Sequence, residues 1–311
     1  MLFYQCKSDR LYNAKREEWT IKGNKLTVDE LILLNLMPDK LHFAPASHQN
    51  YQNQLNTQLN QVACTAILTK DNEAGPTFAR NMDWPAFGIA GTYSLIINRK
   101  NKESNHSTVE VSIPGLIGTL TGLNSMGLAL AMNVCPGNTF SIEGMPAVFY
   151  NRQCLESCAS VEEVDSFVNT HNPLGPYHLS TADQNDAKSF HFFQSQEGDH
   201  LKRDCMSKAL VTTNCNYNEN DGMSSHMHYS KERHQVLDKY FEDLNNTVDP
   251  ESYDQIQLTA AALALPYVNN EVTTHTVIMQ PRTGKMEVVF DNAWSGTRPR
   301  HQVETHSLLH E

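Results

Sequence analysis

Long apolar runs are missing from this 311-residue sequence. No window approaches the roughly 20 apolar residues of a membrane-spanning helix, so no integral membrane segment is expected. The first twenty residues also lack the apolar core that a secretory leader needs. The sequence therefore predicts a soluble chain that does not use the Sec export route. Because no signal peptide is recognised, the cytoplasm is the expected location. A mature form already trimmed of its leader would look the same, so export stays open.

Basic residues are also scarce. The chain has 24 Lys and Arg against 35 Asp and Glu, a formal net charge of −11. A nucleic-acid partner calls for a basic face, so the balance argues against one, and the negative charge is better explained as a solubility feature. Hydrophobic residues make up 40% of the sequence, and the length is sufficient for a sizeable core in one large or two small domains.

Paired cysteine motifs of the zinc type are absent, although the chain has seven cysteines. Cys154 and Cys158 lie four residues apart in a helical pattern, which favours packing on one helix face over redox chemistry. Disulfides are neither indicated nor excluded by the spacing. His226, His228 and His234 form a weak metal-binding pattern without a Cys or Asp to complete it. We therefore expect no metal and no cofactor.

What is present is a β-rich body behind a short helical segment. Residues 28–36 have a helical pattern, and residues 49–61, QNYQNQLNTQLNQ, are typical of an exposed linker. The strands and helices then occur in blocks, which indicates an α+β fold rather than regular strand–helix alternation. Strands are predicted at 64–69, 76–84, 93–100, 107–115, within 115–133, 177–183, 188–195, 209–214 and 274–290, and helices at 144–170 and 231–244.

The segment CTAILTKDNEAGPTFARNMDW, residues 64–84, predicts a hairpin with chemistry at its open end. A turn centred on Asn72-Glu73 would place Cys64 roughly opposite Asn81, with Arg80 beside it. A guanidinium near a thiol favours the reactive thiolate. Asp83 would lie just past the same end, well placed to bind an amino group at residue 64.

An amino group exists at residue 64 only if the chain is cut after Ala63. Cys64 would then carry a nucleophile and a base on one residue, because a free α-amine titrates near pH 7.7–8.0. The alternative is structural: Cys64 is a small buried hydrophobe, and Arg80 and Asp83 form an ordinary surface ion pair. Hairpin geometry alone does not decide between them.

The sequence Cys64-Thr65, followed by Arg80-Asn81-Met82-Asp83, resembles the start of the mature catalytic chain in the N-terminal-nucleophile (Ntn) amidohydrolases. Acid ceramidase, N-acylethanolamine acid amidase, choloylglycine (bile-salt) hydrolase, penicillin V acylase and the acyl-CoA:6-aminopenicillanic-acid acyltransferase group are similar. The resemblance spans roughly residues 28–290, with the linker as an insertion. Its further motifs are ELILLNL at 30–36, the glycine-rich 115–133 ending on Asn133, VTTN ending on Asn214, and YSKERHQVL carrying Arg233.

The resemblance implies a four-layer αββα Ntn-hydrolase sandwich with a short N-terminal helical pro-segment. Residues 1–63 would be a propeptide or small chain, and residues 64–311 the catalytic domain. It also implies oxyanion stabilisation by Asn214, with either Asn133 or a backbone N–H group as a second donor, and a second active-site arginine, Arg233. A turn role for Asn214 and competition from Asn216 remain open, as does a surface position for Arg233.

The implied activity is self-cleavage between Ala63 and Cys64, then hydrolysis of the amide C–N bond of an N-acylated small molecule through a Cys64 thioester. Ceramide-like lipids, N-acylethanolamines, N-acyl amino acids and β-lactams all remain candidate substrates. The alternatives are an acyltransferase of the same fold that uses acyl-CoA, and a catalytically silent Ntn-fold binding protein. Retention of Arg80 favours hydrolysis, because the acyltransferase branch tends to replace it. Homo-oligomerisation remains open.

Overall fold

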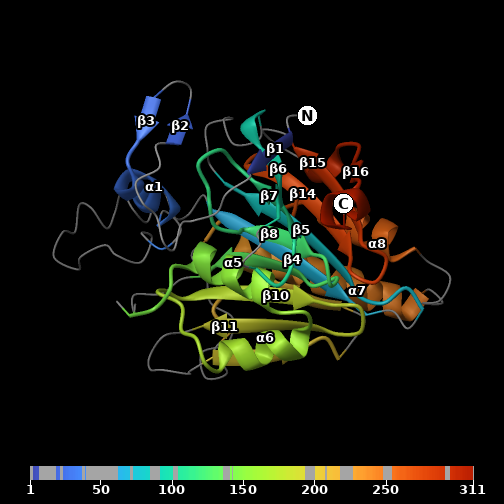
Figure 1. Cartoon of the computed structure of the whole chain (residues 1–311). Coiled ribbons are helices and arrows are strands. Elements are labelled where there is room, and N and C mark those ends of the chain that lie inside the picture. Colours follow the sequence, from blue (N-terminus) through green and yellow to red (C-terminus); the bar gives the residue numbers. More distant parts are fainter. Residues whose placement is uncertain are drawn as a thin grey trace, which may run out of the picture.

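Two sheets, one antiparallel throughout and one with a single parallel pair, stack face to face at the centre of the molecule (Figure 1). The computed structural model describes residues 3–6, 19–21, 24–36, 39, 62–70, 73–84, 92–100, 104–135, 141, 143–192, 200–206, 209–217, 227–247, 254–290 and 295–310. The predicted linker at 49–61 lies outside these residues. No helix in the described part of the chain is long and apolar enough to cross a bilayer.

The first sheet has eight strands in the order β1-β6-β7-β8-β9-β10-β11-β12. Only the β1–β6 pair among them is parallel. The strands are β1 Phe3–Cys6, β6 Leu95–Arg99, β7 Thr108–Ser112, β8 Thr121–Asn124, β9 Ala129–Val134, β10 Tyr177–Ala182, β11 Ala187–Phe192 and β12 His200–Asp204.

The second sheet has six strands in the order β13-β4-β5-β14-β15-β16 and is antiparallel throughout. Its strands are β4 Ala63–Thr69, β5 Thr77–Asp83, β13 Ala209–Thr212, β14 Thr273–Gln280, β15 Lys285–Phe290 and β16 His301–Val303. A separate two-stranded ribbon joins β2 Trp19–Ile21 to β3 Asn24–Leu26.

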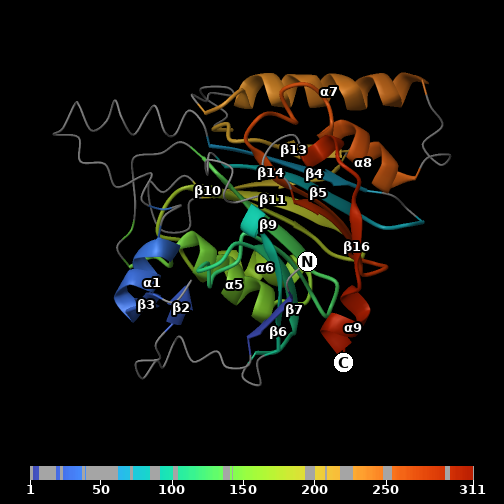
Figure 2. The same ribbon diagram turned by 90° about the horizontal axis from the view of Figure 1, so that it is seen from above.

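Helices cover the outer faces of both sheets (Figure 2). The first sheet carries α5 Ala147–Ser157 and α6 Val161–Val168, and the second carries α7 Ser230–Thr247 and α8 Gln255–Leu263. Short helices α1 Val28–Asn35 and α9 Thr305–His310 and the 3₁₀ turn Ser295–Thr297 complete the described elements. The predicted α+β class and the αββα layering are therefore confirmed.

The side chains of β4 and β5 are buried on both faces, because each strand lies between the other sheet and a helical layer. Ala66, Leu68 and Phe78 pack between the two sheets. Ile67 and Ala79 point the other way, into the layer of α7 and α8. Successive side chains on a strand alternate in this way, so each position on β4 and β5 has a defined layer.

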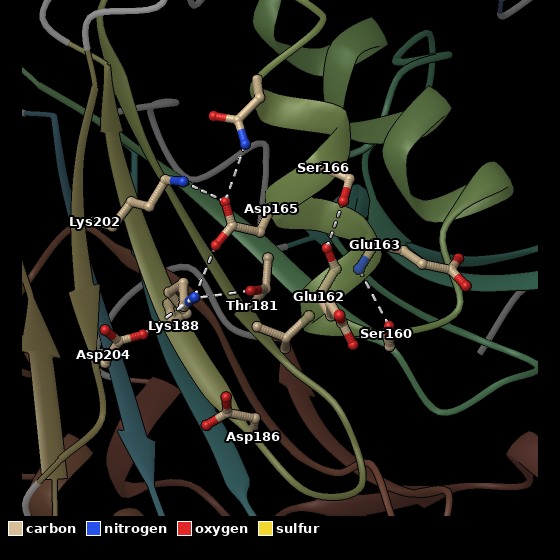
Figure 3. Close-up of polar contacts among 12 residues, drawn as sticks. Ser160, Glu162, Glu163, Asp165, Ser166, Thr181, Asp186, Lys188, Lys202 and Asp204 are labelled. Atoms are coloured by element: carbon tan, nitrogen blue, oxygen red, sulfur yellow. Dashed lines mark hydrogen bonds and ion pairs between the residues drawn. The ribbon is translucent and has the colours of Figure 1, made fainter.

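Helix α5 packs closely against the segment that leads into β8 of the first sheet. A Cβ added at Gly118 would lie 2.5 Å from the Cβ atom of Val148, so only glycine fits there. Helix α6 is fixed to the same sheet by charge (Figure 3). Asp165 forms ion pairs with Lys188 of β11, at 2.9 Å, and with Lys202 of β12.

The N-terminal segment docks on the body through two buried polar residues. Asn35, at the end of α1, donates to the carbonyl of Gly115 at 2.9 Å and accepts from the backbone N–H groups of Ile117 and Gly118. Asp39 accepts from the N–H of Ala147 at the start of α5, 3.2 Å away. A helical segment before the linker is thus present, and its role as a pro-segment remains a prediction.

The helical block predicted at 144–170 is two helices, since Ser160 caps a new helix by accepting from the N–H of Glu163. Cys154 lies within α5, whereas Cys158 is its C-cap residue. Six cysteines with described side chains are buried and free, among them this pair. Sequence patterns missed helices α8 and α9 and strands β1, β2, β3, β12 and β16.

Candidate active site

Cys64 is the second residue of β4, and its side chain faces the interior between the two sheets with 3% exposure. The predicted partner across the hairpin was wrong by one residue: Cys64 pairs with Met82, and Thr65 pairs with Asn81. In this register Cys64 and Arg80 point to the same face of the sheet. Cys64 lies across from Met82, and Met82 and Arg80 are two residues apart on β5, so their side chains point the same way. Arg80 Nη2 lies 3.3 Å from Cys64 Sγ.

The Arg80 side chain bridges the two sheets. It is 1% exposed, and it donates to the backbone carbonyls of Leu120, at 3.1 Å, and Met132, at 2.7 Å, and to the hydroxyl of Thr121. These acceptors lie in or beside β8 and β9 of the first sheet. The guanidinium is therefore held in one position against the thiol, and a surface ion pair with Asp83 is excluded.

Asp83 occupies the opposite face of β5, directly across from Ala63. It is fully buried and accepts a hydrogen bond from Thr273 Oγ1 at 2.6 Å. Burial raises the pKa of this carboxyl, and the charge of Arg233 opposes that shift. Asp83 lies across the strand pair from the Ala63–Cys64 bond. Because burial disfavours its charged form, a new cation at residue 64, such as a protonated amine, would stabilise the carboxylate.

Asn214 contacts the backbone of Cys64 directly. Its Oδ1 accepts from the Cys64 N–H at 2.7 Å, and its Nδ2 donates to the carbonyl of Val134 at 2.6 Å. The Asn214 N–H donates to Ser230 Oγ at 2.8 Å, at the start of α7. Asn214 is fully buried, whereas Asn216 is only partly so, and it is Asn214 that reaches residue 64.

Two donors converge on the Cys64 carbonyl oxygen. Asn133 Nδ2, from β9, lies 3.3 Å away, and Arg233 Nη1, from the first turn of α7, also donates to it. Arg233 further donates to Thr65 Oγ1 and to Asn214 Oδ1, both at 2.8 Å. Arg233 is completely buried, so a position on the helix surface is excluded.

The structure thus brings all six predicted side chains around residues 63–64. They come from three strands, β4, β5 and β9, from the segment after β13 and from helix α7, and both sheets contribute. Sequence reasoning missed two polar residues of the same region, Thr273 and Ser230, which bond to Asp83 and Asn214. Both are small hydroxyl residues at element starts, where a capping or turn role is the ordinary expectation.

The weak histidine pattern can be compared with the described part of the chain. No cluster of three His, Cys, Asp or Glu side chains suited to a metal ion occurs among those residues. His226 lies outside them. His228 instead lies 3.6 Å from Glu271, and His234 bonds to Asp238 at 2.8 Å. The chemistry available at Cys64 is that of a thiol, an arginine, a carboxyl and several amide donors.

Solved structures with the same fold define the class. A Caenorhabditis elegans N-acylethanolamine-hydrolyzing acid amidase ortholog matches with a TM-score of 0.54 at 14% identity, covering 70% of this chain and 93% of its own. A variant of conjugated bile acid hydrolase from Clostridium perfringens matches with a TM-score of 0.57 at 13% identity, covering 78% of this chain and 93% of its own. The chain therefore has the fold of the Ntn-hydrolase superfamily.

The family follows from the sequence match. A family model described as acyl-coenzyme A:6-aminopenicillanic acid acyl-transferase matches residues 68–294. The chain belongs to this family. No curated protein matches it. The matched region begins after Cys64, so the position of the candidate nucleophile rests on the geometry described above.

Proposed function

We propose that the protein is a cysteine amidohydrolase that cuts its own chain between Ala63 and Cys64 and then cleaves the amide C–N bond of N-acylated small molecules. The observation that carries this proposal is the arrangement at Cys64. Its thiol contacts Arg80 and its backbone N–H is bound by Asn214. Its carbonyl receives two side-chain donors. A cysteine needed only for packing requires none of these.

In the self-cleavage step, Cys64 Sγ attacks the carbonyl carbon of Ala63. The peptide C–N bond breaks, the Cys64 nitrogen takes up the thiol proton, and a thioester joins Ala63 to Sγ. Water then hydrolyses the thioester, which releases the Ala63 carboxylate and regenerates the thiol. Asn214 Oδ1 already accepts from the Cys64 nitrogen, and Asp83 lies across from Ala63, so the new amine forms next to two acceptors.

Turnover repeats this chemistry on a substrate amide. The Cys64 sulfur attacks the acyl carbon, and the α-amine transfers the thiol proton to the departing amine. Water, activated by the same amine, then hydrolyses the thioester and frees the acid. Arg80 steadies the thiolate, and Asp83 and Asn214 hold the amine.

The tetrahedral oxyanion needs hydrogen-bond donors, and we assign Asn133 and Asn214 to it. Asn133 Nδ2 already points toward residue 64. Asn214 Nδ2 is bound to the Val134 carbonyl in the uncut chain, and we propose that it turns to the oxyanion after cleavage. Arg233 orients Asn214 by donating to its Oδ1 atom. One oxyanion donor contributes about 3 kcal/mol to transition-state stabilisation.

The substrate class is supported by the relatives, whose names describe hydrolysis of N-acylethanolamines and of conjugated bile acids. We propose an N-acyl amide with a fatty or aromatic acyl group. Acyl transfer from acyl-CoA is a second candidate, because the matching family model is named for an acyltransferase. The two activities share the thioester and differ in the molecule that receives or supplies the acyl group.

A panel of chromogenic N-acyl amides, with and without acyl-CoA and an amine acceptor, tests the proposal. We expect hydrolysis by the cleaved protein and none by Cys64→Ala. Cys205→Ala is the matched control, since Cys205 is also buried, in contact with the Leu68 carbonyl, and should keep full activity. Release of CoA only when an acceptor amine is present would instead support acyl transfer. A correctly cleaved protein with neither activity would support a binding role.

A further inference from the structure

Two histidines form a buried hydrogen-bonded pair beside the candidate site. His178 of β10 and His191 of β11 face each other across the strand pair, and both are fully buried. Their Nδ1 atoms lie 2.7 Å apart. The other nitrogen of His178, Nε2, lies 2.8 Å from the carbonyl oxygen of Cys215, the residue after Asn214. None of the steps proposed above uses either histidine.

These contacts determine where the protons lie. A carbonyl oxygen only accepts, so His178 Nε2 carries a hydrogen and donates it to Cys215. In a neutral ring His178 Nδ1 is then an acceptor, and His191 must donate from its own Nδ1. Two N–H groups cannot face each other at 2.7 Å, so the contact is lost if both facing nitrogens are protonated. The hydrogen bonds therefore run one way, from His191 to His178 to the Cys215 carbonyl.

The environment keeps both rings neutral. Burial lowers the pKa of His178 to about 3 and that of His191 well below its usual value, and the charge of Arg203 lowers both further. Arg203, from β12, lies 4.3 Å from the Tyr217 ring, and this ring packs against both histidines. Tyr217 also contacts His234 of α7, which bonds to Asp238.

The Cys215 carbonyl is one of four attachment points of segment 212–215. Side chains bond to the backbone of each of its residues, and the other three contacts are Asn133 Nδ2 to Thr212 O at 2.9 Å, Thr213 N–H to Tyr217 Oη at 2.8 Å, and Asn214 N–H to Ser230 Oγ at 2.8 Å. His178 also lies directly across from Asn133 in the β9–β10 register. His178 is therefore linked to both proposed oxyanion donors, to Asn214 through the carbonyl of the next residue and to Asn133 through strand pairing.

We infer that His178 is a positioning residue for Asn214, that it acts through the Cys215 carbonyl, and that His191 fixes its tautomer. This inference rests on the proposed function, because it assigns a purpose to the placement of Asn214 against Cys64. Without the His178 donor, Cys215 keeps an unpaired buried carbonyl, and segment 212–215 loses one of its four attachment points, the one next to Asn214. Asn214 then no longer holds its carboxamide against residue 64.

Three variants test the inference. His178→Leu removes the donor, whereas His178→Gln restores an N–H group close to the position of Nε2. The control is Tyr150→Phe, which also removes a buried side-chain donor to a backbone carbonyl, that of His171 at 3.0 Å, in the outer helical layer. We expect at least a tenfold fall in kcat with little change in KM for His178→Leu, recovery to within about threefold for His178→Gln, and no change in kcat for Tyr150→Phe.

Two measurements are independent of turnover. ¹⁵N spectra of the histidine-labelled protein at pH 7 should show His178 as the neutral Nε2–H tautomer and His191 carrying its proton on Nδ1. The rate at which iodoacetamide alkylates Cys64 should change at least threefold in His178→Leu and not in Tyr150→Phe. A His178 proton on Nδ1, or unchanged kcat and alkylation in His178→Leu, would overturn the inference. Absence of any amide hydrolysis by the parent would overturn the proposed function instead.

Discussion

His275 allows a quantitative test of how burial between the two sheets affects the pH dependence of folding stability. It lies on β14, across from Met82 on one side and Phe290 on the other, and is 1% exposed. Neither ring nitrogen has a hydrogen-bond partner among the described residues. Burial lowers the pKa of His275 well below its usual 6.5, and the charge of Arg80 lowers it further.

The sign of the effect follows from this direction. The folded state holds His275 neutral, whereas the unfolded chain takes up a proton below about pH 6.5. Keeping the ring neutral in the folded state therefore lowers the free energy of unfolding, and this loss grows as the pH falls. From pH 7 to pH 5 the unfolded ring alone becomes protonated, which lowers the free energy of unfolding by about 2 kcal/mol. The loss continues until the pH reaches the folded pKa.

Guanidinium unfolding of Cys64→Ala and of Cys64→Ala with His275→Phe at both pH values measures this term. The cysteine variant keeps the chain whole. We expect the drop between pH 7 and pH 5 to be about 2 kcal/mol smaller without His275. His301→Gln, on the exposed part of β16, is the control and should leave the drop unchanged. Equal drops with and without His275 would refute the reasoning.

Three further predictions concern the docked N-terminal segment and the site. Burial raises the pKa of Asp39 to about 6, so the stability that this carboxyl contributes is present in acid and is lost as the pH rises through 6. Asp39→Asn should therefore raise the free energy of unfolding at pH 8 by up to about 3 kcal/mol, measured by thermal or denaturant unfolding. Arg80→Gln should slow both self-cleavage and alkylation of Cys64 at least tenfold, followed by mass spectrometry, because the thiol loses its neighbouring cation. Asn133→Ala should lower kcat about 100-fold with KM little changed in the amide assay, because an oxyanion donor is lost.

Each of these predictions has a clear contrary result. An Asp39→Asn variant that loses stability at pH 8 would show that the carboxylate is paired rather than strained by burial. Arg80→Gln with parental rates would place the guanidinium in a purely structural role. Asn133→Ala with parental kcat would remove Asn133 from the oxyanion site.

The local chemistry of the site could be predicted from sequence because strand alternation and a short turn restrict where side chains point. The hairpin prediction brought Arg80 to the thiol, yet with the wrong partner across the strand. The turn residues between Thr69 and Thr77 did not specify the register to one residue. A one-residue shift changes which side chain lies across from Cys64. Asp83 points away from Arg80 because residues three apart on one strand lie on opposite faces.

Long-range neighbours could not be predicted from periodicity. The bond from Asn214 to the Cys64 N–H joins residues 150 positions apart, and it depends on how β13 aligns with β4. The orientation of the Asn214 carboxamide, with Oδ1 toward Cys64, depends on Arg233 and Val134. Helix α8 was missed because its alanine-rich sequence has little apolar periodicity, although it packs behind Asn81 and Ala79.

The most direct test of the central claim is the intact mass of the purified protein, fresh and after incubation at neutral and mildly acidic pH. The account predicts two fragments from a cut between Ala63 and Cys64, and a single uncut chain for Cys64→Ala under the same conditions. Cys205→Ala should be cut like the parent. A chain that stays whole at every pH, or a cut that survives in Cys64→Ala, would contradict the assignment of Cys64 as a self-generated terminal nucleophile.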